Sequence, residues 1–166
     1  MKPFFPPLTA ALAAALIAAL LPCAALADDH IRIQDGYARG ANPKSGAAFL
    51  VIENAGTTAC KLMGATTDAA DKAELHTSRD EGGVMKMIAT GPIEIGPGES
   101  HALARGGDHI MLMGLKQPLK DGENLALTLD MGDCGVGAVT VPVDNQRKPA
   151  AGQDAGDHAG HGAMTH

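Results

Sequence analysis

The chain has 166 residues, a formal net charge of −6 and an aromatic content of only 2%. This length suits one domain with a real core and is too short for two comfortable ones. The scarcity of aromatic side chains means that aliphatic residues and Met must form that core. The acidic balance argues against nucleic acid as a partner, since nucleic-acid binding calls for a basic patch.

The chain opens with the layout of a secretory signal peptide. Lys2 gives a basic start, residues 8–21 form an apolar run, and small residues end at Ala27. Residues 1–27 are therefore predicted to be a leader that is cleaved after Ala27. An uncleaved membrane anchor is the alternative. Cleavage predicts a periplasmic protein without a stable membrane anchor, and the loss of Lys2 changes the net charge from −6 to −7.

From residue 30 onward, short apolar runs alternate with turn residues. The predicted strands, in chain order, are 30–39, 47–54, 60–67, 73–78, 84–95, 101–107, 109–115, 124–131 and 136–143. About nine short strands, with frequent turn signals and no long helical period, indicate an all-β sandwich or barrel. Residues 68–74 could form a single helical turn. The predicted folded domain covers residues 28–144.

Two cysteines remain after the predicted cleavage, Cys60 and Cys134. An oxidising compartment would allow a disulfide between them, which would stabilise the fold by at most about 4 kcal/mol because the loop is long. The sequence does not show that the two residues meet. Two separate buried thiols are the alternative.

Soft metal donors recur in three of the predicted strands. His109 and Met111 alternate within residues 109–115, so they share one face of that strand. His76 and Met87 lie in two earlier strands. Imidazole and thioether together suit copper(I), whereas hard cations prefer oxygen ligands. A thioether also cannot be lost to disulfide formation in an oxidising compartment.

Each donor has an ordinary structural alternative. A Met in an apolar strand commonly fills the core, and a His in a loop-rich β protein is commonly solvated. The other candidates are predicted to play supporting or structural roles: Met85 and Met113 beside the ligands or in the core, Met63 and Met131 in the core, and His101 exposed.

The spacing His-x10-Met-x21-His-x-Met resembles the signature of the periplasmic CuA-centre copper chaperone family (PCuAC). The resemblance covers about residues 31–143 and includes "GYAR", "AAFLVIEN", "ELH", "GVMKM", "GGDHIMLMGL" and "VTVPV". It implies a cupredoxin-like Greek-key sandwich or barrel. It also implies that Cu(I) is held by His76, Met87, His109 and Met111. One departure is Thr77, where many members carry an additional Met, and it leaves those four residues intact.

The resemblance further implies a periplasmic chaperone that delivers Cu(I) to the CuA centre of cytochrome c oxidase, often alongside a thiol-bearing assembly partner. A periplasmic copper buffer or resistance protein would need the same ligands and is the alternative. A blue-copper electron carrier is excluded because neither Cys60 nor Cys134 lies near a suitably spaced His of the folded domain. An enzyme is not expected, since the sequence has no HExxH motif, nucleophile elbow or Gly-rich phosphate loop.

The mature amino terminus could hold a second type of copper site. Cleavage after Ala27 would make His30 the third residue, after Asp28 and Asp29. The free amine, two backbone amides and the imidazole could then surround Cu(II) in a square plane. The alternative is that His30 only opens the first strand.

The carboxyl end has a different composition from the domain. Residues 145–166 have almost no large apolar side chains and are predicted to be a disordered tail. The tail carries four further candidate ligands for Cu(II) or Cu(I), namely His158, His161, Met164 and His166. It could pass copper to the folded domain, bridge two chains through a shared ion, or be only a soluble end.

Overall fold

The computed structural model describes residues 30–148, so the predicted leader and the four tail donors lie outside the described residues. The strands are β1 (Ile31–Asn42), β2 (Ser45–Asn54), β3 (Cys60–Leu62), β4 (Gly64–Thr66), β5 (Ala70–Asp80), β6 (Met85–Ala89), β7 (Ile93–Ile95), β8 (Ser100–Leu103), β9 (Asp108–Leu115), β10 (Asn124–Asp130) and β11 (Val136–Pro142). One short 3₁₀ helix, η1, spans Gly132–Cys134. Within 30–148, no helix is long and apolar enough to cross a bilayer.

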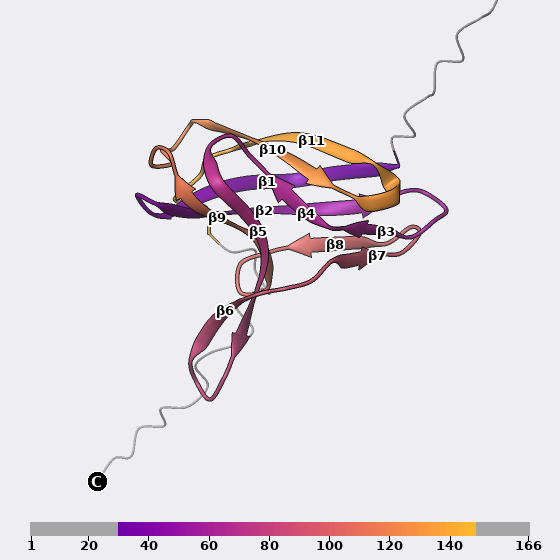
Figure 1. Cartoon of the computed structure of the whole chain (residues 1–166), viewed down its shortest axis with the longest axis horizontal. Helices are drawn as coiled ribbons and strands as arrows, with labels where there is room; N and C mark the ends of the chain where they lie inside the picture. The colour runs from indigo at the N-terminus through magenta and orange to yellow at the C-terminus, as the bar shows by residue number, and fades with distance from the viewer. Residues whose placement is uncertain (1–29, 149–166) are drawn as a thin grey trace, which may run out of the picture.

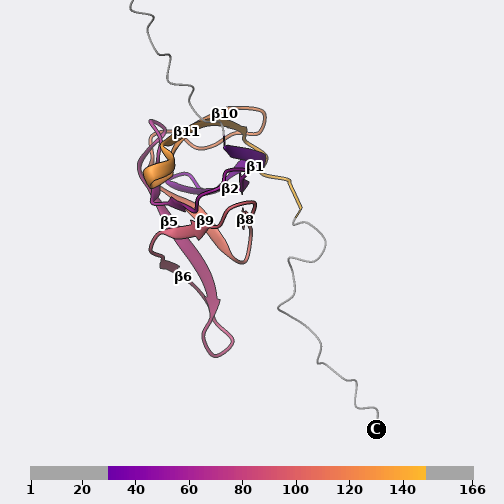
Figure 2. The ribbon, with the colours of Figure 1, turned by 90° about the vertical axis from the view of Figure 1, so that its right-hand side faces the viewer.

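The strands form two layers, which confirms the predicted all-β class. The large sheet has the order β1-β2-β9-β5-β6, with β8 also paired to β2. A second sheet has the order β11-β10-β4 and lies across one face of the large sheet, and β3 pairs with β7 (Figures 1 and 2). Ala38 of β1 also bridges to Val143, just after β11, which ties the two layers together at one edge.

Two of the predicted strands are each divided in the structure, which raises the number of strands in the described residues. The run 60–67 breaks at Met63, because β3 pairs with β7 whereas β4 pairs with β10. The run 84–95 breaks into β6 and β7 around Pro92, which has no amide hydrogen for a ladder. Met63 lies at the first of these breaks and is 48% exposed, so its predicted place in the core is wrong.

The segment predicted as a possible helical turn is also different. Asp68 and Ala69 form a turn, and β5 begins at Ala70. From there, β5 pairs with β9 in the large sheet, so tertiary pairing overrides the weak local preference for a helix.

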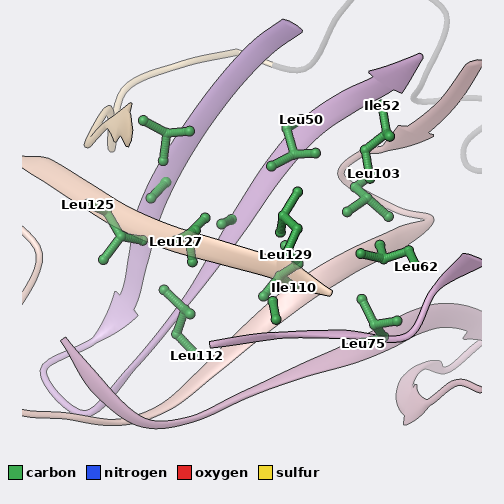
Figure 3. Close-up of a cluster of buried hydrophobic side chains, with 14 of the residues drawn as sticks. Leu50, Ile52, Leu62, Leu75, Leu103, Ile110, Leu112, Leu125, Leu127 and Leu129 are labelled. Carbon is green, nitrogen blue, oxygen red and sulfur yellow. The ribbon is translucent and has the colours of Figure 1, made fainter. Parts of the chain in front are cut away.

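The core between the layers is aliphatic, as the composition requires. Along β10, Leu125, Leu127 and Leu129 are buried and alternate with exposed residues. They pack in one cluster with side chains of β2 and β9 such as Leu50 and Ile110 (Figure 3). Met131, just after β10, is buried in the same cluster, as predicted.

A disulfide joins Cys60 of β3 to Cys134 of η1, with their Cα atoms 5.6 Å apart. The sequence left this pairing open against two separate thiols. The bridge spans a sequence separation of 74 residues, so it restricts the unfolded chain strongly.

The β5–β6 hairpin extends beyond the body of the sandwich (Figures 1 and 2). Its turn contains Gly82 and Gly83, whose φ angles of 68° and 86° favour glycine. Residues 70–77 of β5 pair with β9, whereas residues 78–80 pair only with β6. As the last strand of the large sheet, β6 therefore has one edge without a strand partner in the described residues.

The chain after β11 remains attached to the domain. The Asn145 side chain accepts a hydrogen bond from the Gly40 amide at 2.8 Å, and Arg147 forms an ion pair with Asp35. The Arg147 guanidinium also lies 4.5 Å from the centre of the Tyr37 ring. The predicted start of the tail at residue 145 therefore falls among residues that pack against β1.

Candidate metal centre

The pairing of β5 with β9 places both candidate histidines side by side. His76 lies directly opposite His109, and Glu74 lies opposite Met111. Residues that face each other across a ladder share one side of the sheet, as do residues two apart on one strand. His76, His109 and Met111 therefore all project from the outer face of the large sheet.

The pairing of β5 with β6 brings the fourth donor to the same place. Met87 lies opposite Ser78, which is two residues along β5 from His76. Met87 consequently shares the outer face with His76, on the side away from His109. The strand order thus places two imidazoles and two thioethers on one face, with His76 on the central strand of the three.

His109 presents a free nitrogen lone pair in a buried position. Its Nδ1 lies 3.0 Å from the Gly107 carbonyl oxygen, and the residue is only 2% exposed. Because a carbonyl can only accept, Nδ1 must donate, and the neutral ring keeps its lone pair on Nε2. Nε2 is buried and has no hydrogen-bond partner in the described part of the chain. Such an unpaired acceptor is costly unless something binds it.

His76 offers a second unpaired nitrogen. Its Nε2 lies 3.4 Å from the carboxylate of Glu74, whereas its Nδ1 is buried and has no partner among residues 30–148. The two imidazole ring centres are 6.1 Å apart. A carboxylate behind one ring and a carbonyl behind the other are the supports that orient histidine ligands in metal sites.

A backbone hydrogen bond and two aromatic rings hold the surroundings of His109 in place. The Gly107 carbonyl also accepts the Ser78 amide at 3.2 Å, which links the hairpin to the loop before His109. The Phe49 ring centre lies 6.0 Å from that of His109 and 5.0 Å from that of Tyr37. This aromatic pair forms an apolar wall beside the imidazole.

A pocket of about 450 Å³ opens over this face, lined by Met85, Met87, His109 and Met111 together with Arg39 and Arg105. His76 stands beside the pocket as the cross-strand neighbour of His109. Met87 is 63% exposed, so its thioether is accessible from solvent. Met85 lines the pocket and is also exposed, which places it beside the candidate ligands and not in the core.

The remaining candidates lie elsewhere or outside the described residues. Met113 is half-buried, on the face of Met111 but one step further from His109. His101 was predicted to be exposed, but it is half-buried and its Nε2 lies 3.0 Å from Asp108. His30 immediately precedes β1, and its carbonyl accepts the Ala55 amide. Asp28, Asp29, His158, His161, Met164 and His166 are not described.

The donor set restricts the kind of metal that this face could hold. Across residues 30–148, no three His, Cys, Asp or Glu side chains are grouped so that they could hold a metal ion. The donors that share the outer face are imidazole nitrogen and thioether sulfur, a combination suited to soft ions.

Sequence reasoning missed two groups that contact the histidines, Glu74 and the Gly107 carbonyl, and two residues that only border the pocket, Arg39 and Arg105. Only Glu74 had a usable signal, because its position two residues before His76 places both on one face of a strand. The others come from β1 and from the β8–β9 loop, whose approach to the pocket depends on the strand order.

Together, the two-layer sandwich and its His/Met face define a cupredoxin-like β domain of the PCuAC type. Residues 29–143 match the family model described as "Putative lipoprotein LpqE-like", and the chain belongs to this LpqE-like family. It is 35% identical over 116 residues to "Putative lipoprotein Lxx21020" of Leifsonia xyli subsp. xyli, covering 69% of this chain and 70% of that protein.

Similar solved structures confirm the predicted fold and the PCuAC resemblance. The apo PCuAC domain of PmoF1 is 21% identical with a TM-score of 0.58, over 69% of this chain and 93% of that one. Apo-DR1885 of Deinococcus radiodurans is 30% identical with a TM-score of 0.54, over 88% and 97%. The Cu(I) form of DR1885 is 31% identical with a TM-score of 0.52, over 73% and 84%.

Proposed function

We propose that this protein is an exported copper(I) chaperone whose folded domain holds the ion with His76, Met87, His109 and Met111. The observation that carries the proposal is the pair of buried imidazole nitrogens that have no hydrogen-bond partner among residues 30–148 and stand on one face of the sheet with two thioether residues. Each histidine already has an oxygen acceptor near its other nitrogen. Copper(I) would satisfy both free nitrogens at once.

The chemistry of the donors fits a transferable soft ion. Imidazole and thioether ligands are neutral, and thioethers need not lose a proton before they bind. Relatives support the same assignment, since the solved structures of similar proteins include a Cu(I) form of DR1885. Kinship with a lipoprotein supports export, in agreement with the leader predicted at residues 1–27.

Transfer is favoured over sequestration by the exposure of one candidate ligand. Met87 lies on the edge strand β6 and is largely solvent-accessible. An acceptor could therefore reach the ion from this side while His109 remains buried. We propose the CuA-bearing subunit of cytochrome c oxidase as the acceptor, with a thiol-bearing assembly protein also taking part. The proposed process is ligand exchange at copper, without a catalysed reaction.

The termini would supply secondary sites. His30 with the new amino terminus would take Cu(II), and the His158–His166 segment would take Cu(II) or Cu(I). A chain ending at Lys148 keeps the Arg147 contacts and should bind fewer Cu(II) ions than the full chain. An unchanged Cu(II) stoichiometry would remove the tail from the proposal.

The function is tested by anaerobic transfer. The Cu(I)-loaded protein is mixed with a copper-free, soluble CuA-bearing domain, the two proteins are separated at intervals, and the copper content of each is measured, because a CuA site filled with Cu(I) alone is colourless. A chaperone should load the acceptor faster than a Cu(I) chelate of equal affinity does. Equal or slower loading would indicate a buffer, and failure to retain Cu(I) against a competing chelator would contradict the proposal altogether.

A further inference from the structure

Beside the candidate metal pocket, we propose that Arg39, Arg105 and Arg147 form a docking surface for an acidic face of the protein that accepts copper. We call these three residues the arginine rim. This inference rests on the proposed function, because it concerns how an acceptor reaches the same pocket. It adds a group of residues that would govern docking without binding the ion.

The rim lies directly at the pocket. Arg39, from β1, and Arg105, from the β8–β9 loop, line the same cavity as Met87 and His109. Arg147 is adjacent, because its carbonyl oxygen lies 3.4 Å from Nη1 of Arg105. Arg39 and Arg105 thus border the thioether pocket itself, and the backbone of Arg147 lies next to Arg105, with its guanidinium over the Tyr37 ring.

The causes of the pKa shift of Tyr37 indicate the same clustering of arginines. Burial raises the pKa of its phenol, while the positive charges of Arg105, Arg147 and Arg39 oppose that shift and Asp35 adds slightly to it. Three guanidinium groups therefore lie within electrostatic range of a single phenol. The arginine rim is a local concentration of positive charge.

Most of that charge is unmatched within the described chain. Asp35 pairs with Arg147, whereas Arg39 and Arg105 form no ion pair with any residue from 30 to 148. The whole protein nevertheless carries a net charge of −6. The rim has the opposite sign to the rest of the molecule, so it would attract an acidic partner and orient it toward the pocket.

The β5–β6 hairpin supplies apolar surface next to the rim. Val84, Met85 and Met87 are all exposed there, and Met85 and Met87 also line the pocket. Arg and Met are enriched at protein interfaces, where an apolar centre is bordered by polar groups. The expected occupant is an acceptor whose carboxylates surround its own sulfur or nitrogen donors.

The rim can be tested with two peptides in place of an acceptor. One alternates Asp with Leu and the other alternates Lys with Leu; leucine keeps an apolar contact but cannot remove copper. Each peptide is titrated into the Cu(I)-loaded protein at low ionic strength and followed by NMR chemical shifts. We expect the Asp peptide to bind at least tenfold more tightly, and added salt to remove most of the difference.

Substitutions then show which residues bind the Asp peptide. Arg39→Gln and Arg105→Gln should each weaken binding of the Asp peptide roughly two- to fivefold, the range for an exposed ion pair. Arg39→Lys should keep most of the affinity because it keeps the charge. Arg32→Gln is the matched control, since Arg32 lies near the other end of β1 and should leave peptide binding unchanged.

The same variants separate this inference from the proposed function. Cu(I) affinity should not fall in Arg39→Gln/Arg105→Gln, because removing positive charge near a cation does not weaken its binding. Equal binding of both peptides, or Asp-peptide binding indifferent to the double substitution, would overturn the arginine rim while leaving copper binding intact. The inference would also be overturned if the Asp peptide bound a chain that ends at Lys148 but not the full-length chain. That result would show that residues 149–166 occupy the rim. Failure of the wild-type protein to hold Cu(I) would instead overturn the proposed function.

Discussion

The two faces of β9 carry different tasks on one strand. Ile110 and Leu112 point inward and are completely buried between the layers. His109, Met111 and Met113 alternate with them and belong to the outer face. The period of two therefore separates a face that stabilises the fold from a face that collects metal donors. Substitutions on the two faces should accordingly change different measured quantities.

The largest effect on stability is expected from the disulfide, because Cys60 belongs to the buried core and not to the outer face. Replacing Cys60 and Cys134 by Ser should lower the free energy of unfolding by about 4 kcal/mol, because the released loop gains entropy when the chain unfolds. Urea denaturation monitored by circular dichroism measures this change. Cu(I) affinity at low denaturant should stay close to that of the wild type. Unchanged stability would show that the bridge does not restrict the unfolded state.

A single truncation on the inner face should follow in size. Leu112→Ala should lower the free energy of unfolding by about 3 kcal/mol, since it removes methyl groups from a closely packed core. The same urea titration gives the value. The folded fraction should still bind Cu(I), because Leu112 faces away from the pocket. Loss of copper binding from fully folded protein would contradict the separation of the two faces.

On the outer face, Met111→Leu should show the reverse pattern. Cu(I) affinity should fall at least about tenfold, or about 1.4 kcal/mol, because leucine has no sulfur. The free energy of unfolding should change by less than about 1.5 kcal/mol, since bulk and apolarity are retained. A competition titration with a Cu(I) chelator measures the affinity.

Met113→Leu is the matched control for that experiment. It makes the same change on the same face of β9, two residues further from His109 and outside the pocket lining. It should leave Cu(I) affinity unchanged. If Met111→Leu cost stability and kept copper, Met111 would be a packing residue, and the candidate centre would lose one of its ligands.

The smallest effect concerns Tyr37, which stacks on Phe49 in the aromatic wall beside His109. Burial raises the pKa of its phenol, so its ionisation should have a midpoint above the ordinary value of about 10. The folded state holds this proton more tightly than the unfolded state. Its contribution to stability is therefore full below about pH 10 and is lost as the pH rises through the folded pKa.

Ultraviolet absorbance can follow this ionisation directly, because Tyr37 is the only tyrosine of the chain. Arg105→Gln should move the midpoint further upward, since it removes a positive charge that favours the phenolate. A downward movement would show that Arg105 does not act on Tyr37 through its charge.

Much of the architecture was accessible from the sequence because the strands alternate strongly. The pattern of β10, with buried Leu125, Leu127 and Leu129, follows directly from a period of two. The same period placed His109 and Met111 on one face. The breaks at Met63 and Pro92 were missed because each adjoining piece is too short to show its own period, and their pairing partners lie far away in the chain.

The meeting of the four donors depends on information that periodicity does not contain. His76 faces His109 because β5 pairs with β9, and Met87 shares their face because β6 pairs with the other edge of β5. Spacing in the sequence gives no strand order, so the resemblance to PCuAC had to imply it. The arginine rim could not be predicted from the sequence, because Arg39 and Arg105 come from two distant segments that meet only in the folded domain.

The central claim is that two imidazole nitrogens and two thioether sulfurs surround one copper(I) ion. X-ray absorption of the anaerobic Cu(I)-loaded protein tests it most directly, with the chain ended at Lys148 so that the tail donors are absent. The account predicts a mixed nitrogen and sulfur shell that loses sulfur in Met111→Leu and nitrogen in His109→Ala. A shell of nitrogen and oxygen only, or one that both variants leave unchanged, would contradict it.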